Sequence, residues 1–195
     1  MASMQDSTLH IHTFRLGENG EIVRASGAPR LSMLRRAHEW QITSPDDKEK
    51  VIAQLERMLA GDDEAHDFLR QRAALMVDEM LENALYAAPR DANGGQLFPK
   101  GDRRGILPEE RIILRCDFDG ERLSLEVSDS WGSLSPETVQ HFIALNLADD
   151  GVHGDRAGRG LFFMWRLMDD FYVRVTPGEE TSIGGALPLY PHPNI

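Results

Sequence analysis

The sequence predicts an α+β fold, a two-layer α/β sandwich in which helices cover one face of a mostly antiparallel sheet. Two observations carry this prediction. Helical patterns come first along the chain and are followed by strand hairpins that alternate with further helices. The hairpin signal is clearest at Asp119-Gly120, a turn pair between two apolar strand patterns.

The chain is expected to divide into an N-terminal extension, residues 1–37, and a second domain, residues 38–195. In the extension, extended patterns at 9–16 and 21–25 flank a glycine-containing turn and predict a hairpin. The second domain is expected to open with a short strand at 38–43. A helix is then expected from Ser44 to Gly61, since serine suits the N-cap and Pro45 the first helical position.

A longer helix is predicted from Glu64 to Ala88, where Pro89 ends it. Residues 90–108 are rich in Gly, Asp and Pro and are expected to form a long mobile connection, because such length within a compact domain is usually functional or disordered. Five apolar residues of the long helix recur at core-compatible spacing: Phe68, Leu75, Met76, Met80 and Leu85.

The C-terminal half is predicted to contain two hairpins and two helices. Residues 111–118 pair with 122–128 in the first hairpin, and residues 171–176 with 181–189 in the second. Helices are expected at 135–146 and 159–170, separated by a polar loop at 147–157.

Composition and charge exclude several classes of function. With 21 Lys and Arg against 32 Asp and Glu, the net charge is −11, so nucleic-acid binding and attachment to anionic membranes are not expected. No apolar run approaches the ~20 residues of a membrane helix, and the N-terminus lacks the pattern of a signal peptide. Cys116 is the only cysteine, lies in an apolar strand pattern and is expected in the core of a cytoplasmic protein.

Glu79 and Asn83 are four residues apart on the long helix and therefore share one face. Mg²⁺ prefers oxygen ligands completed by waters and phosphates, which an Asn carbonyl oxygen suits. A carboxylate one turn earlier can deprotonate a nucleophile that approaches a terminal phosphate. The alternative is a solvated helix face, since the acids Asp78 and Glu82 lie beside this pair.

Asp129 follows a strand and precedes Ser130-Trp131-Gly132-Ser133. A carboxylate at a strand end can accept the exocyclic amine of adenine, while small neighbours leave room for the base. The alternative is an Asx turn, because Asp, Ser and Gly are common turn residues.

Gly158-Arg159-Gly160-Leu161 opens the last predicted helix. Glycines let backbone N–H groups approach phosphate oxygens, and the helix N-terminus favours negative charge. Arg159 can add a phosphate contact. The alternative is an ordinary glycine-rich helix start, since neither a G-x-G-x-x-G nor a Walker A pattern is present.

In this order the three blocks resemble those of the GHKL ATPase superfamily, which includes gyrase, histidine kinases and MutL-type ATPases. The nearest likeness is to stand-alone anti-sigma-factor serine kinases, and it spans about residues 38–189. The resemblance implies a Bergerat-type fold with ATP and Mg²⁺ as cofactors. Glu79 and Asn83 match the E-x-x-x-N box, which implies a general base and a Mg²⁺ ligand. Gly158, Gly160 and Leu161 match the G-x-G-[LIM] box on the phosphate side.

The match to the remaining D-x-G-x-G box is partial. Asp129 takes the place of the adenine-binding carboxylate, but Trp131 and Ser133 stand where the family has glycines, and Gly132 is expected to compensate by a shifted turn. The Trp131 ring is expected to stack on the adenine, narrow the pocket or abolish nucleotide binding. Thr181 matches a late threonine that is usual near the adenine.

The resemblance implies a cytoplasmic regulator that binds Mg·ATP and phosphorylates or sequesters a partner protein. The expected partner is a sigma factor, an anti-sigma antagonist or a response regulator, and a homodimer is expected by analogy. Residues 147–157 would close over the nucleotide. One alternative is a degenerate, non-catalytic interaction module, which Trp131 favours. Another is the separate ATPase half of a two-component histidine kinase.

Overall fold

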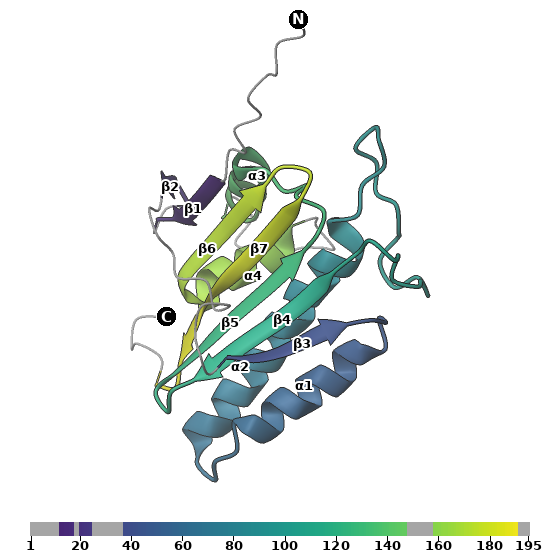
Figure 1. Ribbon diagram of the computed structural model, residues 1–195. Coiled ribbons are helices and arrows are strands. Elements are labelled where there is room, and N and C mark those ends of the chain that lie inside the picture. The colour runs from purple at the N-terminus through teal and green to yellow at the C-terminus, as the bar shows by residue number, and fades with distance from the viewer. Residues whose placement is uncertain (1–11, 18–19, 25–36, 148–157, 191–195) are drawn as a thin grey trace, which may run out of the picture.

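The computed structural model describes residues 12–17, 20–24, 37–147 and 158–190 (Figure 1). In this part of the chain seven strands form one antiparallel sheet in the order β2-β1-β6-β7-β5-β4-β3. Their bounds are β1 His12–Leu16, β2 Ile22–Arg24, β3 His38–Ile42, β4 Ile112–Phe118, β5 Arg122–Asp129, β6 Asp169–Thr176 and β7 Glu180–Pro188. Both predicted C-terminal hairpins are therefore confirmed.

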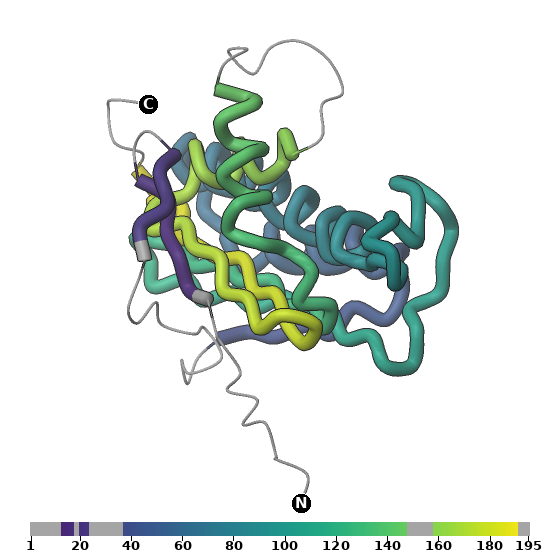
Figure 2. The backbone as a smooth tube through the Cα atoms, turned by 90° about the horizontal axis from the view of Figure 1, so that it is seen from above, coloured from purple at the N-terminus to yellow at the C-terminus, as the bar shows by residue number. Residues whose placement is uncertain are grey.

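The helices lie together on one face of the sheet, as the view from above shows (Figure 2). They are α1 Asp47–Met58, α2 Glu64–Glu82, a π-helical turn η2 at Asn83–Ala87, α3 Pro136–Leu147 and α4 Arg159–Leu167. Leucines of β5 and methionines of α2 meet in the core between the layers. The predicted two-layer α+β sandwich is confirmed.

The strand interpretation of Cys116 is confirmed as well. Its thiol is completely buried and unpaired, and this burial raises the pKa of Cys116 to about 12. The residue therefore acts as a small apolar side chain within β4.

The first helix begins three residues later than the sequence suggested, at Asp47. The Asp47 carboxylate accepts hydrogen bonds from the backbone N–H groups of Thr43 and Ser44, each at 3.0 Å. Ser44 and Pro45 form a turn before the helix, closed by a bond from the Asp47 N–H to the Ser44 carbonyl. Asp46, and not Ser44, is the N-cap by backbone geometry. The Ser44 hydroxyl nevertheless accepts a hydrogen bond from the Asp46 N–H at 3.2 Å, so Ser44 and Asp47 exchange bonds around this turn much as in a capping box.

The long helix differs from its prediction in two respects. It is α-helical only to Glu82 and continues as the π-helical turn η2, in which the Ala88 N–H donates to the Asn83 carbonyl at 2.7 Å. Phe68 and Leu75, expected in the core, are 47% and 42% exposed. Both lie on the side of α2 that faces away from the sheet. The helical spacing of apolar residues does not by itself show which of them face the sheet.

The described part of the N-terminal extension is joined to the same sheet. β1 pairs with β2 and also with β6, and the Trp165 indole N–H of α4 donates to the Gly17 carbonyl at 3.2 Å. A Cβ built on Gly20 would lie 2.8 Å from Ile143 Cγ2 of α3. Gly17 and Gly20, on either side of the turn, thus contact α4 and α3. The predicted loop at 147–157 falls, from residue 148 onward, outside the described residues.

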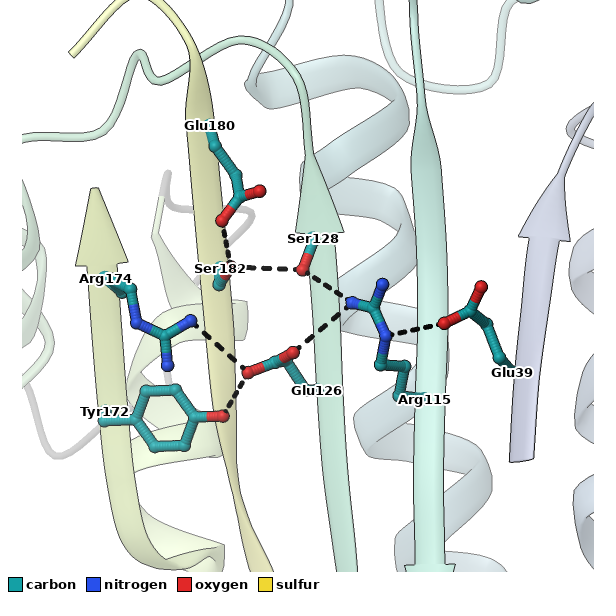
Figure 3. A network of polar contacts seen from close by, with 8 residues as sticks. All are labelled: Glu39, Arg115, Glu126, Ser128, Tyr172, Arg174, Glu180 and Ser182. Atoms are coloured by element: carbon teal, nitrogen blue, oxygen red, sulfur yellow. Dashed lines mark hydrogen bonds and ion pairs between the residues drawn. The ribbon is translucent and has the colours of Figure 1, made fainter. Parts of the chain in front are cut away.

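The sheet face opposite the helices carries a buried polar network (Figure 3). Glu126 of β5, 1% exposed, lies between Arg115 at 3.4 Å and Arg174 at 3.7 Å. Its second oxygen also accepts a hydrogen bond from the Tyr172 hydroxyl at 2.6 Å. The residues of this network come from β4, β5 and β6, so their contacts join these three strands. The carboxylate and its cationic partners are withdrawn from solvent together.

Candidate functional site

A cavity of about 240 Å³ opens between the end of the long helix, the ends of β5 and β7, and the helices α3 and α4. It brings together five of the residues predicted from the sequence motifs: Asn83, Asp129, Gly158, Leu161 and Thr181. The remaining lining residues are Ala87, Ala88, Arg90, Gln96, Ser133, Leu134, Thr138, Phe142 and Ile183. The cavity therefore combines apolar side chains with convergent polar groups, as small-molecule sites usually do.

Asp129 and Thr181 face each other across neighbouring strands. They are register partners in the β5–β7 pairing and are 6% and 2% exposed. The Trp131 N–H donates to Asp129 Oδ1 at 2.9 Å, which is the contact of an Asx turn. The Asx-turn interpretation of Asp129 is therefore confirmed, and the same side chain lines the cavity, where adenine binding stays a prediction.

Burial raises the pKa of Asp129 to about 7. Loss of hydration is the main cause, since it disfavours the charged carboxylate. Hydrogen bonds from the N–H groups of Trp131 and Gly132 act in the opposite direction, while the charges of Glu180 and Glu110 raise the pKa further. Asp129 is thus a carboxyl group that titrates near neutral pH.

Two polar side-chain atoms at the cavity have no hydrogen-bond partner within the described residues. They are the amide nitrogen of Asn83 and the hydroxyl of Thr181, both buried. A buried polar group without a partner is costly unless something satisfies it. These atoms fit a ligand with polar groups of its own, as a nucleotide has.

The Asn83 side chain could also contribute one ligand to a Mg²⁺ ion. The described part of the chain holds no group of three or more His, Cys, Asp or Glu side chains that could bind a metal ion. An ion bound at Asn83 would therefore take most of its ligands from phosphate oxygens and water, which Mg²⁺ readily accepts.

Glu79 lies beside the cavity and does not line it. A Cβ built on Gly160 would lie 2.3 Å from Glu79 Oε2, so the Glu79 carboxylate packs closely against the start of α4, although its flexible side chain could move aside for a larger residue. The neighbouring acids Asp78 and Glu82 form ion pairs with Lys48 of α1, at 2.8 and 2.5 Å. These two acids therefore belong to an ion-pair cluster between α1 and α2, and the solvated-face interpretation does not describe Glu82, whose side chain is 13% exposed.

Gly158 forms the N-cap of α4 with a positive φ of 80°. A Cβ there would lie 2.3 Å from Phe142 Cγ, so both the backbone conformation and the contact with α3 require glycine. Gly158 and Leu161 place the start of α4 at the cavity. Arg159 is exposed and not brought to the lining; its guanidinium lies 5.9 Å from the centroid of the Phe163 ring.

Trp131 and Gly132 also lie outside the lining. The Trp131 indole N–H donates to Glu110 Oε1 at 3.2 Å, so the ring does not narrow this cavity as one expectation had it. Stacking on adenine and loss of nucleotide binding stay predictions. Gly132 has a φ of +56°, and a Cβ on it would meet the Thr176 carbonyl oxygen at 2.2 Å. Its carbonyl accepts a hydrogen bond from the Gly178 N–H at 3.1 Å. The shifted glycine therefore packs beneath the β6–β7 turn.

Several lining residues were missed by the motif analysis. Arg90 and Gln96 come from the irregular connection after η2, and Thr138 and Phe142 from α3. None of them belongs to a spacing pattern. Ser133 did carry a signal, because it stands at a family glycine position; its hydroxyl donates to the Ala88 carbonyl at 2.7 Å.

Comparison with protein families gives a match over residues 43–183 to the family described as Histidine kinase-like ATPase domain. The chain belongs to this family. The match includes every motif residue at the cavity, from Asn83 to Thr181, and supports a GHKL-type ATP-binding domain. Among curated proteins, none matches the chain. No helix in the described ranges of this histidine kinase-like ATPase domain has the length and apolarity needed to cross a membrane.

Proposed function

We propose that this chain binds Mg·ATP in the cavity and transfers the terminal phosphoryl group to a serine or threonine of a partner protein. The observation that carries the proposal is the pair of buried, unpaired groups, the Asn83 amide and the Thr181 hydroxyl, in one cavity with Asp129. The family match over residues 43–183 supports ATP as the nucleotide.

Each motif has a role in this scheme. The ionised Asp129 accepts the exocyclic amino group of adenine, and the Thr181 hydroxyl bonds next to it. Backbone N–H groups at the start of α4, from Gly158 onward, receive the phosphates. Asn83 would hold Mg²⁺, which when bound neutralises the charge of the phosphate oxygens. Glu79 takes the proton of the attacking hydroxyl, the new O–P bond forms, and ADP leaves with the electrons of the broken bond.

The partner in this proposal is a regulatory protein of the kind that anti-sigma-factor kinases act on. A sigma factor, an anti-sigma antagonist or a response regulator would be bound, and phosphorylation would control the complex. A homodimer of the chain is part of the same proposal. These assignments rest on the motif resemblance described above.

Calorimetric titration with ATP, with and without Mg²⁺, tests the nucleotide site. We expect micromolar, magnesium-dependent binding, weakened about ten-fold or more by Asn83→Ala and by Asp129→Asn, since each removes a polar contact to the ligand. Asn93→Ala is the matched control, because Asn93 is exposed and does not line the cavity. A folded protein that gives no heat at millimolar ATP would refute the proposal.

A second candidate function is a nucleotide-binding module without phosphoryl transfer. The position of Glu79 favours it, because this carboxylate contacts Gly160 and does not line the cavity. Glu79→Gln separates the two functions in an assay with γ-labelled ATP and a candidate partner. A kinase loses label transfer in this variant while ATP binding persists, whereas a module transfers no label even as wild type. Acid-labile label on the partner would instead indicate the half of a histidine kinase.

A further inference from the structure

Trp131 is anchored outside the cavity by a buried carboxylate. Its indole N–H donates to Glu110 Oε1 at 3.2 Å, while its backbone N–H donates to Asp129 Oδ1 at 2.9 Å. One residue thus connects the carboxylate of the proposed adenine site to Glu110. The glycine that the family carries here could make only the backbone contact.

Glu110 forms an ion pair with Arg104 that is almost completely withdrawn from solvent. The exposed fractions of the Arg104 and Glu110 side chains are 3% and 0%. Glu110 Oε2 accepts hydrogen bonds from Arg104 and from the Leu107 N–H, the latter at 3.0 Å. The Arg104 guanidinium also lies 3.9 Å from the centroid of the Phe98 ring. A buried pair with these additional contacts has a fixed geometry, because loss of any partner leaves a charge unsatisfied.

The same guanidinium reaches the turn that carries Asn83. Arg104 Nη1 donates to the Leu85 carbonyl at 2.6 Å. Leu85 lies within η2, whose last carbonyls have no following helical N–H groups to accept. Arg104 supplies one of the missing donors, and so holds the end of the long helix in place.

A shorter connection joins the same two segments. The Ser133 hydroxyl donates to the carbonyl of Ala88, directly after η2, at 2.7 Å. Ser133 and Trp131 are the two positions at which this chain departs from the glycines of the D-x-G-x-G box. Both departures therefore place a hydrogen-bonding side chain between the Asp129 turn and the Asn83 side of the cavity.

We infer that Trp131, Glu110 and Arg104 form a positioning device for the nucleotide site, which fixes the turn after Asp129 relative to the π-helical turn that carries Asn83. The inference rests on the proposed function, since it takes Asp129 and Asn83 to contact one nucleotide. None of the three residues lines the cavity. Each is a positioning residue that acts through the two groups that do.

Removal of the indole N–H tests this device with little change in packing. Trp131→Phe is compared with Trp40→Phe, because Trp40 also donates its indole N–H to a side chain, Gln54 Oε1 at 2.6 Å, but does so between β3 and α1. We expect Trp131→Phe to raise the Kd for Mg·ATP about ten-fold, as the loss of a hydrogen bond to a charged group predicts. Trp40→Phe should leave the Kd within about two-fold, since a distant polar contact has no coupling to the site.

Two further readouts distinguish positioning from general destabilisation. Trp131→Phe should weaken the binding of Mg·ATP more than the binding of adenosine, because adenosine binding depends on the Asp129 side of the cavity alone. A purely structural role of Trp131 would leave both Kd values unchanged in the folded protein. Trp131→Gly restores the family pattern and should nevertheless weaken Mg·ATP binding. Equal Mg·ATP affinities of Trp131→Phe and Trp40→Phe, or tighter binding by Trp131→Gly, would overturn the inference alone. A wild-type chain that does not bind Mg·ATP would refute the proposed function and this inference with it.

Discussion

Nucleotide binding by this chain should weaken steeply between pH 8 and pH 6, because Asp129 must be ionised to accept the amino group of adenine. The pKa of this carboxyl is raised to about 7 by burial. A group with this pKa is about nine-tenths ionised at pH 8 and about one-tenth ionised at pH 6, so the apparent Kd for Mg·ATP should rise about ten-fold over this range.

Stability should change in the opposite direction. An acid whose pKa is higher in the folded than in the unfolded chain binds its proton more tightly when folded, so its contribution to stability is greatest at low pH and is lost as the pH rises from about 4 to about 7. The difference between 3.8 in the unfolded chain and about 7 in the fold corresponds to about 4 kcal/mol, an upper value. Ionised Asp129 therefore costs stability at the pH where it binds ligand best.

The matched variant is Asp129→Asn, which keeps the shape of the side chain and removes its titration. At pH 8 it should melt at a higher temperature than the wild type, and its weak residual affinity for Mg·ATP should not follow the wild-type pH profile. Calorimetry measures the affinities and scanning calorimetry the melting temperatures. A wild-type Kd that stays constant from pH 8 to pH 6 would refute the reasoning. An Asp129→Asn variant whose Kd changes with pH as steeply as that of the wild type would also refute it, because the titrating group would then be the nucleotide.

Three further substitutions test contacts in different parts of the fold, each by urea denaturation. Trp165→Phe removes the indole donor to the N-terminal hairpin and should lower the unfolding free energy by about 1 kcal/mol; no loss would mean that the hairpin is not held by this bond. Gly132→Ala, with its Cβ 2.2 Å from a backbone oxygen, should cost about 3 kcal/mol, against about 1 for Ala at Gly120, where nothing lies within 4 Å. Glu126→Gln removes the buried counter-charge of Arg174 and Arg115, of which Arg115 keeps Glu39 at 2.8 Å, and should cost about 3 kcal/mol.

The sequence identified those site residues that a single regular element positions. Asn83 comes from the four-residue spacing on a helix and Asp129 from the end of a strand, while Thr181 came from the resemblance and proved to lie on the neighbouring strand. In each case the local conformation sets the direction of the side chain. The family match covers all three boxes, and the cavity is lined by residues from each of them.

Other features depend on contacts between distant segments, which a pattern does not encode. The helical period found the apolar residues of α2 but could not tell that Phe68 and Leu75 face away from the sheet. Nor does any spacing show that the Trp131 ring turns toward Glu110, since the deciding hydrogen bond joins residues 21 apart. Carbonyls of the π-helical turn likewise accept hydrogen bonds from Gln96 and Arg104, which lie in the connection that follows it and belong to no spacing pattern.

Several residues of the three boxes have a structural reason to be present even without a nucleotide. Gly132 fits beneath the β6–β7 turn, Gly158 against Phe142 and Gly160 against Glu79. A chain that had lost phosphoryl transfer would keep Gly132 and Gly158, because both have a positive φ and a larger residue would clash, whereas the flexible Glu79 side chain could give way to a residue at position 160. The Asn83 amide and the Thr181 hydroxyl differ, since each is buried without a partner in the described chain and gives the ligand-free fold no compensating hydrogen bond. Alanine at either position should therefore reduce nucleotide affinity while leaving the melting temperature of the free protein unchanged or higher.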